Sequence, residues 1–201
     1  MTDLFSTTGP RRLDMPGADV TYYAAPDLGA SADELFARLM DETPWEQRSI
    51  TIQGREIPQP RLVSWHGDAD YTYSGLKLAP NPWTPMLAGL RHRLQEICDA
   101  KFNSVLLNRY RSGKDSVGMH ADNEKELRDR PLIASISLGA ERVFDMRRAD
   151  GTGSTVHIPL EHGSLVVMAG TTQKFWKHGI AKTTKPVGER INLTFRLTYP
   201  R

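Results

Sequence analysis

The sequence predicts a mainly β protein with flanking helices (α+β), whose strands form a sandwich or barrel. One observation is a series of short strand patterns in the C-terminal part, with glycines between or just outside them. Another is a pair of helical patterns nearer the N-terminus, one after Ser31 and one after Thr84. The strand patterns cover residues 132–138, 142–147, 154–160, 164–169 and 190–199.

The size of the chain fits one domain. Its 201 residues leave room for a core, and 39% hydrophobic with 25% charged residues is typical of a soluble globular protein. Residues 1–16 are polar and interrupted by prolines, so we expect a loose arm there. Residues 17–201 are then one domain without internal repeats, and we expect a monomer.

The single Cys98 excludes an internal disulfide and fits a reducing compartment. It lies at helical spacing from Leu90 and Leu94, so we expect a buried small hydrophobe rather than a nucleophile. The N-terminus has no basic-then-apolar signal pattern, and no apolar run is long enough to cross a membrane. The sequence therefore predicts a cytoplasmic protein.

Charge is unevenly distributed along the chain. Residues 1–50 contain four arginines and nine acidic residues, a net charge of −5. Residues 51–201 contain 22 basic and 15 acidic residues, a net charge of +7. A basic C-terminal part is expected where the substrate carries phosphates, although many proteins that never bind nucleic acid share such a bias.

The two helices have recognisable starts. Residues 19–24 predict a short strand, and Ser31 with Glu34 then has the spacing of a capping box. Thr84 and Pro85 introduce the second helix, through about residue 100. The apolar positions of the two helices are Leu35, Phe36, Leu39, Met86, Leu87, Leu90, Leu94, Ile97 and Cys98.

Between the helices the sequence predicts a β-hairpin. Residues 49–52 alternate, Gln53-Gly54 offers a turn, and residues 55–57 form the return strand. Pro58 and Pro60 cannot continue the ladder, which favours an exposed edge ribbon.

Two pairs of residues two positions apart share a face. Tyr71 and Tyr73 lie in an extended stretch and could stack on an unpaired base, or one ring could pack in the core. Residues 105–110 predict a strand with Asn108 and Tyr110 on one face.

His120 and Asp122 are also two positions apart, so an imidazole and a carboxylate point the same way. A metal site needs a third arm, and His178 is the best candidate. Two histidines and one carboxylate leave coordination positions open, which suits a non-haem Fe(II) oxygenase. A His-x-Asp pair alone is weak, because it is frequent by chance.

The segment from Arg190 to Thr198 alternates strictly and predicts a strand. Arg190 and Arg196 lie about 20 Å apart on its polar face at ~3.3 Å per residue. Leaning inward, two arginines could bracket a small dicarboxylate. The alternative, favoured for an isolated strand, is a solvated outer face with ordinary surface arginines. The polar face comprises Arg190, Asn192, Thr194 and Arg196.

From about Arg61 to the C-terminus the chain resembles the AlkB family of Fe(II)- and 2-oxoglutarate-dependent dioxygenases. It looks closest to the branch that acts on 1-methyladenine and 3-methylcytosine. The resemblance is carried by Asn108-Arg109-Tyr110, His120-x-Asp122, His178, Arg190-x-Asn192-x-Thr194-x-Arg196, Tyr71-Thr72-Tyr73-Ser74-Gly75 and Pro80-Asn81-Pro82-Trp83.

The resemblance implies a double-stranded β-helix of jelly-roll type over about residues 104–199, with a nucleotide-recognition cover over about 45–75. It implies Fe(II) bound by His120, Asp122 and His178, with 2-oxoglutarate and O2 as co-substrates. The residues that it assigns to 2-oxoglutarate are Arg190 with Tyr110 and Asn192 at the distal carboxylate, Arg196 and Asn108 toward the metal, and Thr194 beside them.

The resemblance also implies a reaction on alkylated DNA, with RNA left open. A base swung out of its stack loses an N-methyl group, and succinate, CO2 and formaldehyde are released. Tyr71, and less firmly Tyr73, would form the wall of the base pocket, and Glu124 would accept the exocyclic amine. Alternatively, Glu124 is a surface charge.

One departure concerns the strand preference. Family members that prefer duplex DNA place an aromatic wedge near the hairpin tip, where this chain has Gln53. That departure argues against duplex specialisation. The alternative, which we favour, is that Gln53 is simply a solvated turn residue.

Two other functions are compatible with parts of the sequence. A 2-oxoglutarate-dependent hydroxylase of a protein or small molecule would share the metal site, but it gives no role to Tyr71, Glu124 or the basic C-terminal part. A non-enzymatic jelly-roll module with structural zinc would need a fourth ligand that the sequence does not offer.

Overall fold

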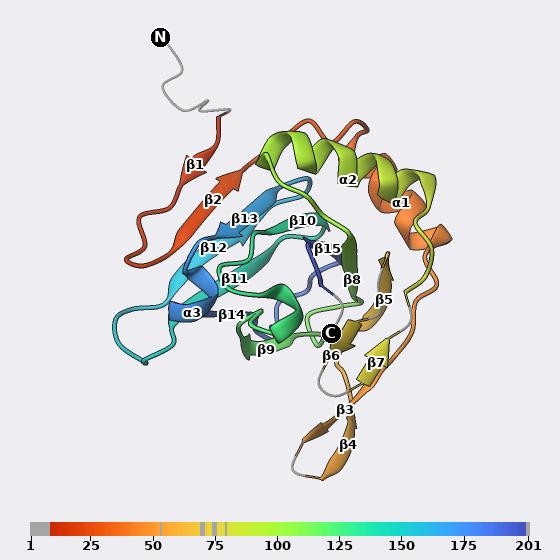
Figure 1. Cartoon of the computed structure of the whole chain (residues 1–201). Helices are drawn as coiled ribbons and strands as arrows, with labels where there is room; N and C mark the ends of the chain where they lie inside the picture. The colour runs from red at the N-terminus through yellow and green to blue at the C-terminus, as the bar shows by residue number, and fades with distance from the viewer. Residues whose placement is uncertain (1–8, 53, 69–70, 74–75, 79, 200–201) are drawn as a thin grey trace.

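The computed structural model describes residues 9–52, 54–68, 71–73, 76–78 and 80–199, with the backbone alone for residues 50–52, 71–73 and 76–78. Two β-sheets pack face to face across a shared apolar cluster that draws residues from both (Figure 1). Two helices lie against the large sheet. The prediction of a mainly β chain with flanking helices is confirmed.

Neighbouring strands in both sheets are antiparallel. The large sheet contains β1 (Arg11–Arg12), β2 (Asp19–Tyr23), β5 (Leu62–Gly67), β8 (Ser104–Tyr110), β10 (Ile133–Gly139), β13 (Leu165–Ala169) and β15 (Arg190–Arg196), in the order β1-β2-β13-β10-β15-β8-β5. The small sheet contains β9 (Val117–His120), β11 (Arg142–Arg148), β12 (Val156–Leu160) and β14 (Trp176–Ile180), in the order β12-β11-β14-β9.

Strand β15 lies inside the molecule with both faces buried. Ile191, Leu193 and Phe195 pack in a core cluster with leucines of α1 (Ala32–Glu42) and α2 (Pro85–Cys98). The polar residues of the strand point the other way, toward the space between the sheets. Arg190 and Arg196 are 2% and 4% exposed, so the alternative of a solvated outer face is wrong.

Both helices begin at the predicted caps. The backbone N–H of Glu34 donates to Ser31 Oγ at 3.1 Å, and that of Leu87 donates to Thr84 Oγ1 at 3.2 Å. Near the end of α2, burial raises the pKa of Cys98 to about 11. The thiol therefore stays protonated and behaves as the small hydrophobe that the helical spacing predicts.

Two short hairpins lie beside β5, at the edge of the large sheet (Figure 1). The first joins β3 (Ser49–Ile52) to β4 (Arg55–Pro58), which confirms the predicted hairpin and its end at Pro58. The second joins β6 (Tyr71–Tyr73) to β7 (Leu76–Leu78). Every residue of β4 is exposed. Gln53, expected at the first tip, lies outside the described residues.

The sequence predicts a loose arm over residues 1–16, but the structure packs residues 11–16 onto the body. Strand β1 pairs with β2 and thereby covers a sheet edge. The carbonyl of Pro16 accepts hydrogen bonds from Trp176 Nε1 at 3.0 Å and from Arg148 Nη1 at 3.2 Å. Residues 1–8 lie outside the described part of the chain.

Candidate metal and co-substrate site

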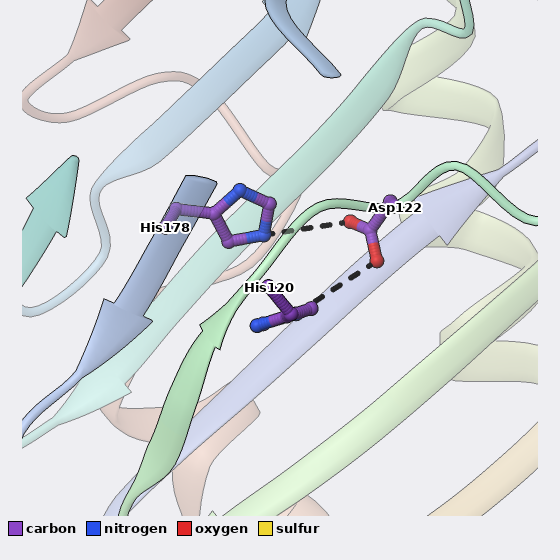
Figure 2. A group of neighbouring side chains, drawn as sticks. All are labelled: His120, Asp122 and His178. Atoms are coloured by element: carbon purple, nitrogen blue, oxygen red, sulfur yellow. Dashed lines mark ion pairs between the residues drawn. The ribbon is translucent and has the colours of Figure 1, made fainter. Parts of the chain in front are cut away.

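Three side chains distant in sequence converge between the two sheets (Figure 2). His120 ends β9 and lies directly opposite His178 of β14 in the antiparallel ladder, while Asp122 follows two residues later. One ligand atom from each residue lies within 4.8 Å of the others. The Nε2 atoms of His120 and His178 are 3.9 Å and 3.7 Å from the two carboxylate oxygens of Asp122. The sequence prediction that these three residues meet is confirmed.

Neighbouring groups hold Asp122 and His120 in place. The backbone N–H of Asp122 donates to Gln173 Oε1 at 2.9 Å, and Arg196 Nη2 donates to its carboxylate at 2.8 Å. His120 Nδ1 lies 2.9 Å from the carbonyl of Gly118, which favours a proton on Nδ1 and leaves the Nε2 lone pair for a metal. Sequence reasoning did not identify Gln173, because nothing in its local pattern distinguishes it.

The site is electrostatically prepared for a cation. Burial alone would raise the pKa of Asp122, but the charges of Arg196, His178 and His120 outweigh it and lower the pKa to about 2. Burial, and then the nearby charge of His120, lowers the pKa of His178 to about 3. A carboxylate and neutral imidazoles are the protonation states that a divalent metal requires. The donor set therefore fits Fe(II) with open coordination positions.

A cavity adjoins the three side chains. Polar residues of β8 and β15 line one side of it, and apolar residues of the small sheet, such as Phe144 and Ile180, line the other. The three metal ligands line this cavity, and so do all six residues that the resemblance assigns to 2-oxoglutarate. These six residues are Asn108, Tyr110, Arg190, Asn192, Thr194 and Arg196.

Arg190 is a buried cation with unused donors. Its Nη2 donates to Ser137 Oγ at 2.9 Å, but Nε and Nη1 have no hydrogen-bond partner among the described residues. Burial lowers the pKa of the guanidinium, whose carbon lies 5.0 Å from the centre of the Tyr110 ring. A buried unpaired charge is costly, and a carboxylate from outside the chain would offset that cost. The cavity therefore fits an anionic co-substrate.

A chain of hydrogen bonds crosses the cavity wall. Arg61 Nε donates to Asn108 Oδ1 at 2.7 Å, and Asn108 Nδ2 donates to Asn192 Oδ1 at 3.4 Å. The Thr194 hydroxyl donates to the same Asn192 oxygen at 2.9 Å. Asn192 Nδ2 in turn donates to Ser135 Oγ at 2.8 Å. Both amides are thereby oriented, and Arg61 joins the site although no sequence motif pointed to it.

The predicted base-binding residues are less fully placed. The backbone of Tyr71 and Tyr73 forms β6, but their side chains lie outside the described residues. Glu124 precedes a short 3-10 helix (Lys125–Leu127) and is not part of the cavity lining as described. Its Oε2 is buried and has no hydrogen-bond partner within the described part of the chain.

Two further histidines have structural partners. His157 Nδ1 lies 2.6 Å from Asp145, and the backbone N–H of Gly139 donates to His162 at 2.7 Å. Neither residue belongs to the group formed by His120, Asp122 and His178. No helix in the described part of the chain is long and apolar enough to cross a membrane.

Comparison with known proteins places the chain in a family. The model of the 2OG-Fe(II) oxygenase superfamily matches residues 22–196. The alpha-ketoglutarate-dependent dioxygenase alkB homolog 3 of Rattus norvegicus is 43% identical over 178 residues, which cover 84% of this chain and 60% of that protein. The human DNA oxidative demethylase ALKBH2 is 38% identical over 205 residues, which cover 94% of this chain and 78% of the relative.

Among solved structures, that of OsALKBH1 shares the fold, with a TM-score of 0.65 at 15% identity over 94% of this chain and 99% of that chain. The chain spans about 60% of the length of the alkB homolog 3 proteins that it matches. The jelly-roll prediction agrees with the fold of this family. The chain belongs to the 2OG-Fe(II) oxygenase superfamily and, within it, to the AlkB family of Fe(II)- and 2-oxoglutarate-dependent dioxygenases.

Proposed function

We propose that the protein removes methyl groups oxidatively from N-alkylated bases in DNA, with 1-methyladenine and 3-methylcytosine as substrates. In this reaction 2-oxoglutarate and O2 are consumed, and succinate, CO2 and formaldehyde are released. The observation that carries the proposal is the His120, Asp122 and His178 group beside a cavity in which Nε and Nη1 of Arg190 have no hydrogen-bond partner among the described residues. The relative named DNA oxidative demethylase, 38% identical over most of this chain, supports DNA as the substrate.

The protein's own residues have separate tasks in this scheme. His120, Asp122 and His178 would hold Fe(II), which supplies the oxidative chemistry when 2-oxoglutarate and O2 are bound. Arg190, aided by Tyr110, pairs with the distal carboxylate of the co-substrate. The described part of the cavity seals the reaction from water on the Arg190 side, because its walls there are buried.

Arg196 and Asn108 act nearer the metal in the proposed arrangement. Arg196 already donates to Asp122, so it keeps that carboxylate charged and oriented. Asn108 is held by Arg61 on one side and by Asn192 on the other. Two pre-oriented amides reduce the ordering that the co-substrate has to impose when it binds.

A cationic methylated base would be recognised through charge and stacking. Glu124 offers a buried carboxylate oxygen without a donor, which suits the exocyclic amine of the base. The Tyr71 ring is the proposed stacking partner, and a cation over an aromatic face is attracted by its quadrupole. Both groups would favour 1-methyladenine and 3-methylcytosine over neutral bases.

The nucleic-acid strand is expected to run over the basic part of the molecule. Residues 51–201 carry a net charge of +7. Exposed lysines flank His178 in the sequence, and they are candidates for phosphate contacts. These residues are Lys174, Lys177, Lys182 and Lys185.

A demethylation panel tests the proposed function. Matched single- and double-stranded DNA and RNA oligonucleotides, each with one 1-methyladenine or 3-methylcytosine, are incubated with Fe(II), 2-oxoglutarate and O2, and the bases are measured by mass spectrometry. The proposal requires loss of the methyl group with equimolar formaldehyde and succinate. Succinate formation without base demethylation would support the alternative, a hydroxylase of a protein or small molecule.

We further propose that the protein works as a monomer in the cytoplasm, where its single cysteine stays reduced. Size-exclusion chromatography with light scattering tests the first statement, and cell fractionation tests the second.

A further inference from the structure

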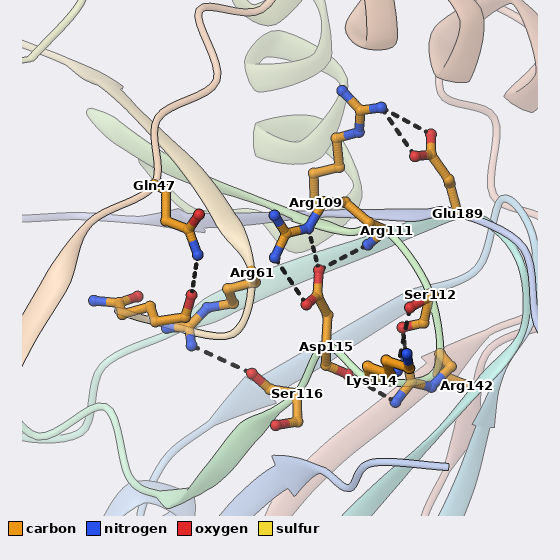
Figure 3. Close-up of polar contacts among 11 residues, drawn as sticks. Gln47, Arg61, Arg109, Arg111, Ser112, Lys114, Asp115, Ser116, Arg142 and Glu189 are labelled. Carbon is orange, nitrogen blue, oxygen red and sulfur yellow. Dashed lines mark hydrogen bonds and ion pairs between the residues drawn. The ribbon is translucent and has the colours of Figure 1, made fainter. Parts of the chain in front are cut away.

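Arg142, at the start of β11, joins two loops that come from opposite sheets, and Figure 3 shows its contacts with the first of them. Its Nη1 donates to the carbonyl of Ser112 at 3.3 Å, and its Nη2 donates to the carbonyls of Asp115 at 3.1 Å and Ala181 at 2.6 Å. Ser112 and Asp115 belong to the loop between β8 and β9 (residues 111–116), and Ala181 begins the loop between β14 and β15 (residues 181–189). Arg142 itself is only 5% exposed.

The two loops also touch each other directly. The backbone N–H of Thr183 donates to the carbonyl of Gly113 at 2.8 Å. A Cβ atom on Gly113 would lie 2.5 Å from the carbonyl oxygen of Thr183, a distance that real side chains do not adopt. The close approach therefore needs glycine at this position.

The junction lies next to the residues that matter for the reaction. The 111–116 loop follows Tyr110 directly and leads into β9, which ends at His120. Ala181 follows the strand that carries His178. A change in the spacing of the two loops would therefore act on Tyr110 and on both histidine strands.

Arg142 has no carboxylate of its own among its hydrogen-bond partners. The carboxylate of Asp115 instead binds Arg111, through Nε at 2.8 Å and Nη2 at 3.0 Å (Figure 3). Three carbonyl dipoles hold the Arg142 charge, and burial lowers the pKa of the guanidinium. The Tyr110 ring lies near two arginines, with its centre 5.8 Å from the guanidinium carbon of Arg142 and 5.0 Å from that of Arg190.

We propose that Arg142 is a positioning residue for the co-substrate. By holding both loops beside Tyr110, it keeps Tyr110 and Arg190 in place to receive the distal carboxylate of 2-oxoglutarate. Its charge adds to the positive potential at this end of the cavity, which a dianion would offset. This inference rests on the co-substrate of the proposed function and not on the identity of the methylated base.

The test measures binding of 2-oxoglutarate to the Fe(II)-loaded protein without oxygen, by titration calorimetry. Arg142→Met is expected to raise the Kd about tenfold, the size of one misplaced charge-assisted hydrogen bond. Arg142→Lys keeps the charge but loses the planar guanidinium that bonds the three carbonyls, so a smaller rise in the Kd is expected. Gly113→Ala keeps Arg142 and separates the loops, so its Kd should also rise. The Kd for Fe(II) should rise less than the Kd for 2-oxoglutarate in all three variants, because Tyr110 adjoins the 111–116 loop directly whereas His120 and His178 lie three or more residues from either loop.

Arg93→Met is the matched control. Arg93 lies on α2, and its guanidinium pairs with Asp27 and, at 2.8 Å, with Glu96, so its described contacts involve neither loop. Its loss should lower the melting temperature slightly without moving the Kd by more than about twofold.

An unchanged Kd in both Arg142→Met and Gly113→Ala, with lower melting temperatures, would show that the junction is only structural and overturn the proposal. If Arg142→Met does not fold, Gly113→Ala and Arg142→Lys decide the question on the same measurement. A wild-type protein that binds 2-oxoglutarate but demethylates no base would refute the base-repair function and leave this test intact.

Discussion

Strand β15, which lines the cavity, and the β3–β4 hairpin beside β5 are built in opposite ways. Every residue of β15 is buried, and Arg190 and Asn192 bond to serines of the neighbouring strand β10 while Arg196 bonds to Asp122. Every residue of β4 is exposed, and its pairing is with β3 alone. A reaction centre needs fixed geometry, whereas a surface that meets a long polymer gains from room to adapt. Substitutions in the two regions should therefore differ in size and in kind.

The largest effect is expected at the metal site. His120→Ala should abolish succinate formation and iron binding, because one of three ligands is lost and outer-sphere substitutions alone cost about 10–100-fold. Mass spectrometry of succinate and an iron assay measure the two effects. His157→Ala is the control, since His157 pairs only with Asp145 near the surface. Iron-dependent turnover by His120→Ala would remove this ligand assignment.

The next largest effect is expected at Arg190. Arg190→Met should raise the KM for 2-oxoglutarate by about 10–100-fold, because a charge-assisted hydrogen bond is lost, while iron binding stays nearly intact. The melting temperature without co-substrate should not fall, since the variant removes a buried cation that lacks an anionic partner. Full activity at low 2-oxoglutarate would contradict the role of Arg190.

Gln173→Ala should have a moderate effect on metal binding. The backbone N–H of Asp122 would lose its acceptor, so iron affinity should fall about tenfold while the KM for 2-oxoglutarate at saturating iron stays the same. Competition with a chelator measures the affinity. Gln47→Ala is the control, because Gln47 bonds only the carbonyl of Gln59 among the described contacts. Equal affinities of both variants and the wild type would exclude the positioning role of Gln173.

The metal-free protein should lose stability as the pH falls. The pKa of His178 is lowered from 6.5 to about 3, so the unfolded chain binds the extra proton first. The contribution of His178 to the free energy of unfolding is thus complete above about pH 6.5 and is lost progressively down to about pH 3. Chemical unfolding across this range should show a slope that His178→Gln reduces by about one proton. An unchanged slope in the variant would contradict a buried neutral imidazole.

The smallest effect is expected at the hairpin tip. If the resemblance to the AlkB family holds at this position, where it leads us to expect an aromatic wedge in duplex-preferring members, Gln53→Phe should raise activity on double-stranded substrate a few-fold. Activity on single-stranded substrate and the KM for 2-oxoglutarate should not change. Demethylation rates on matched single- and double-stranded oligonucleotides measure the ratio of the two activities. A change in the KM for 2-oxoglutarate would mean that the hairpin and the cavity are not independent.

Local patterns predicted the elements well. Capping residues placed α1 and α2, and strict alternation placed β15. Alternation shows that the two faces of a strand differ, but it does not show that both are buried. For that reason the sequence left open whether Arg190 and Arg196 lie on a solvated surface. In the structure the small sheet covers both side chains.

The supporting residues could not be predicted in this way. Gln173, Arg61 and Arg142 act through partners 27 to 55 residues away in sequence. Such contacts depend on how the sheets stack, and the residue types involved are common on surfaces. The ligands themselves were predicted because the two-residue spacing of His120 and Asp122, which is weak evidence alone, occurs together with His178 and the other motifs that resemble the AlkB family.

The hydrogen bond from Trp176 to Pro16 has a practical consequence for handling the protein. Trp176 precedes the ligand His178 by two residues, so this hydrogen bond connects the N-terminal segment directly to strand β14, which carries His178. Trimming the first 18 residues to improve crystals or expression would free the indole donor and uncover the edge of β2. Tags are better attached ahead of residue 9.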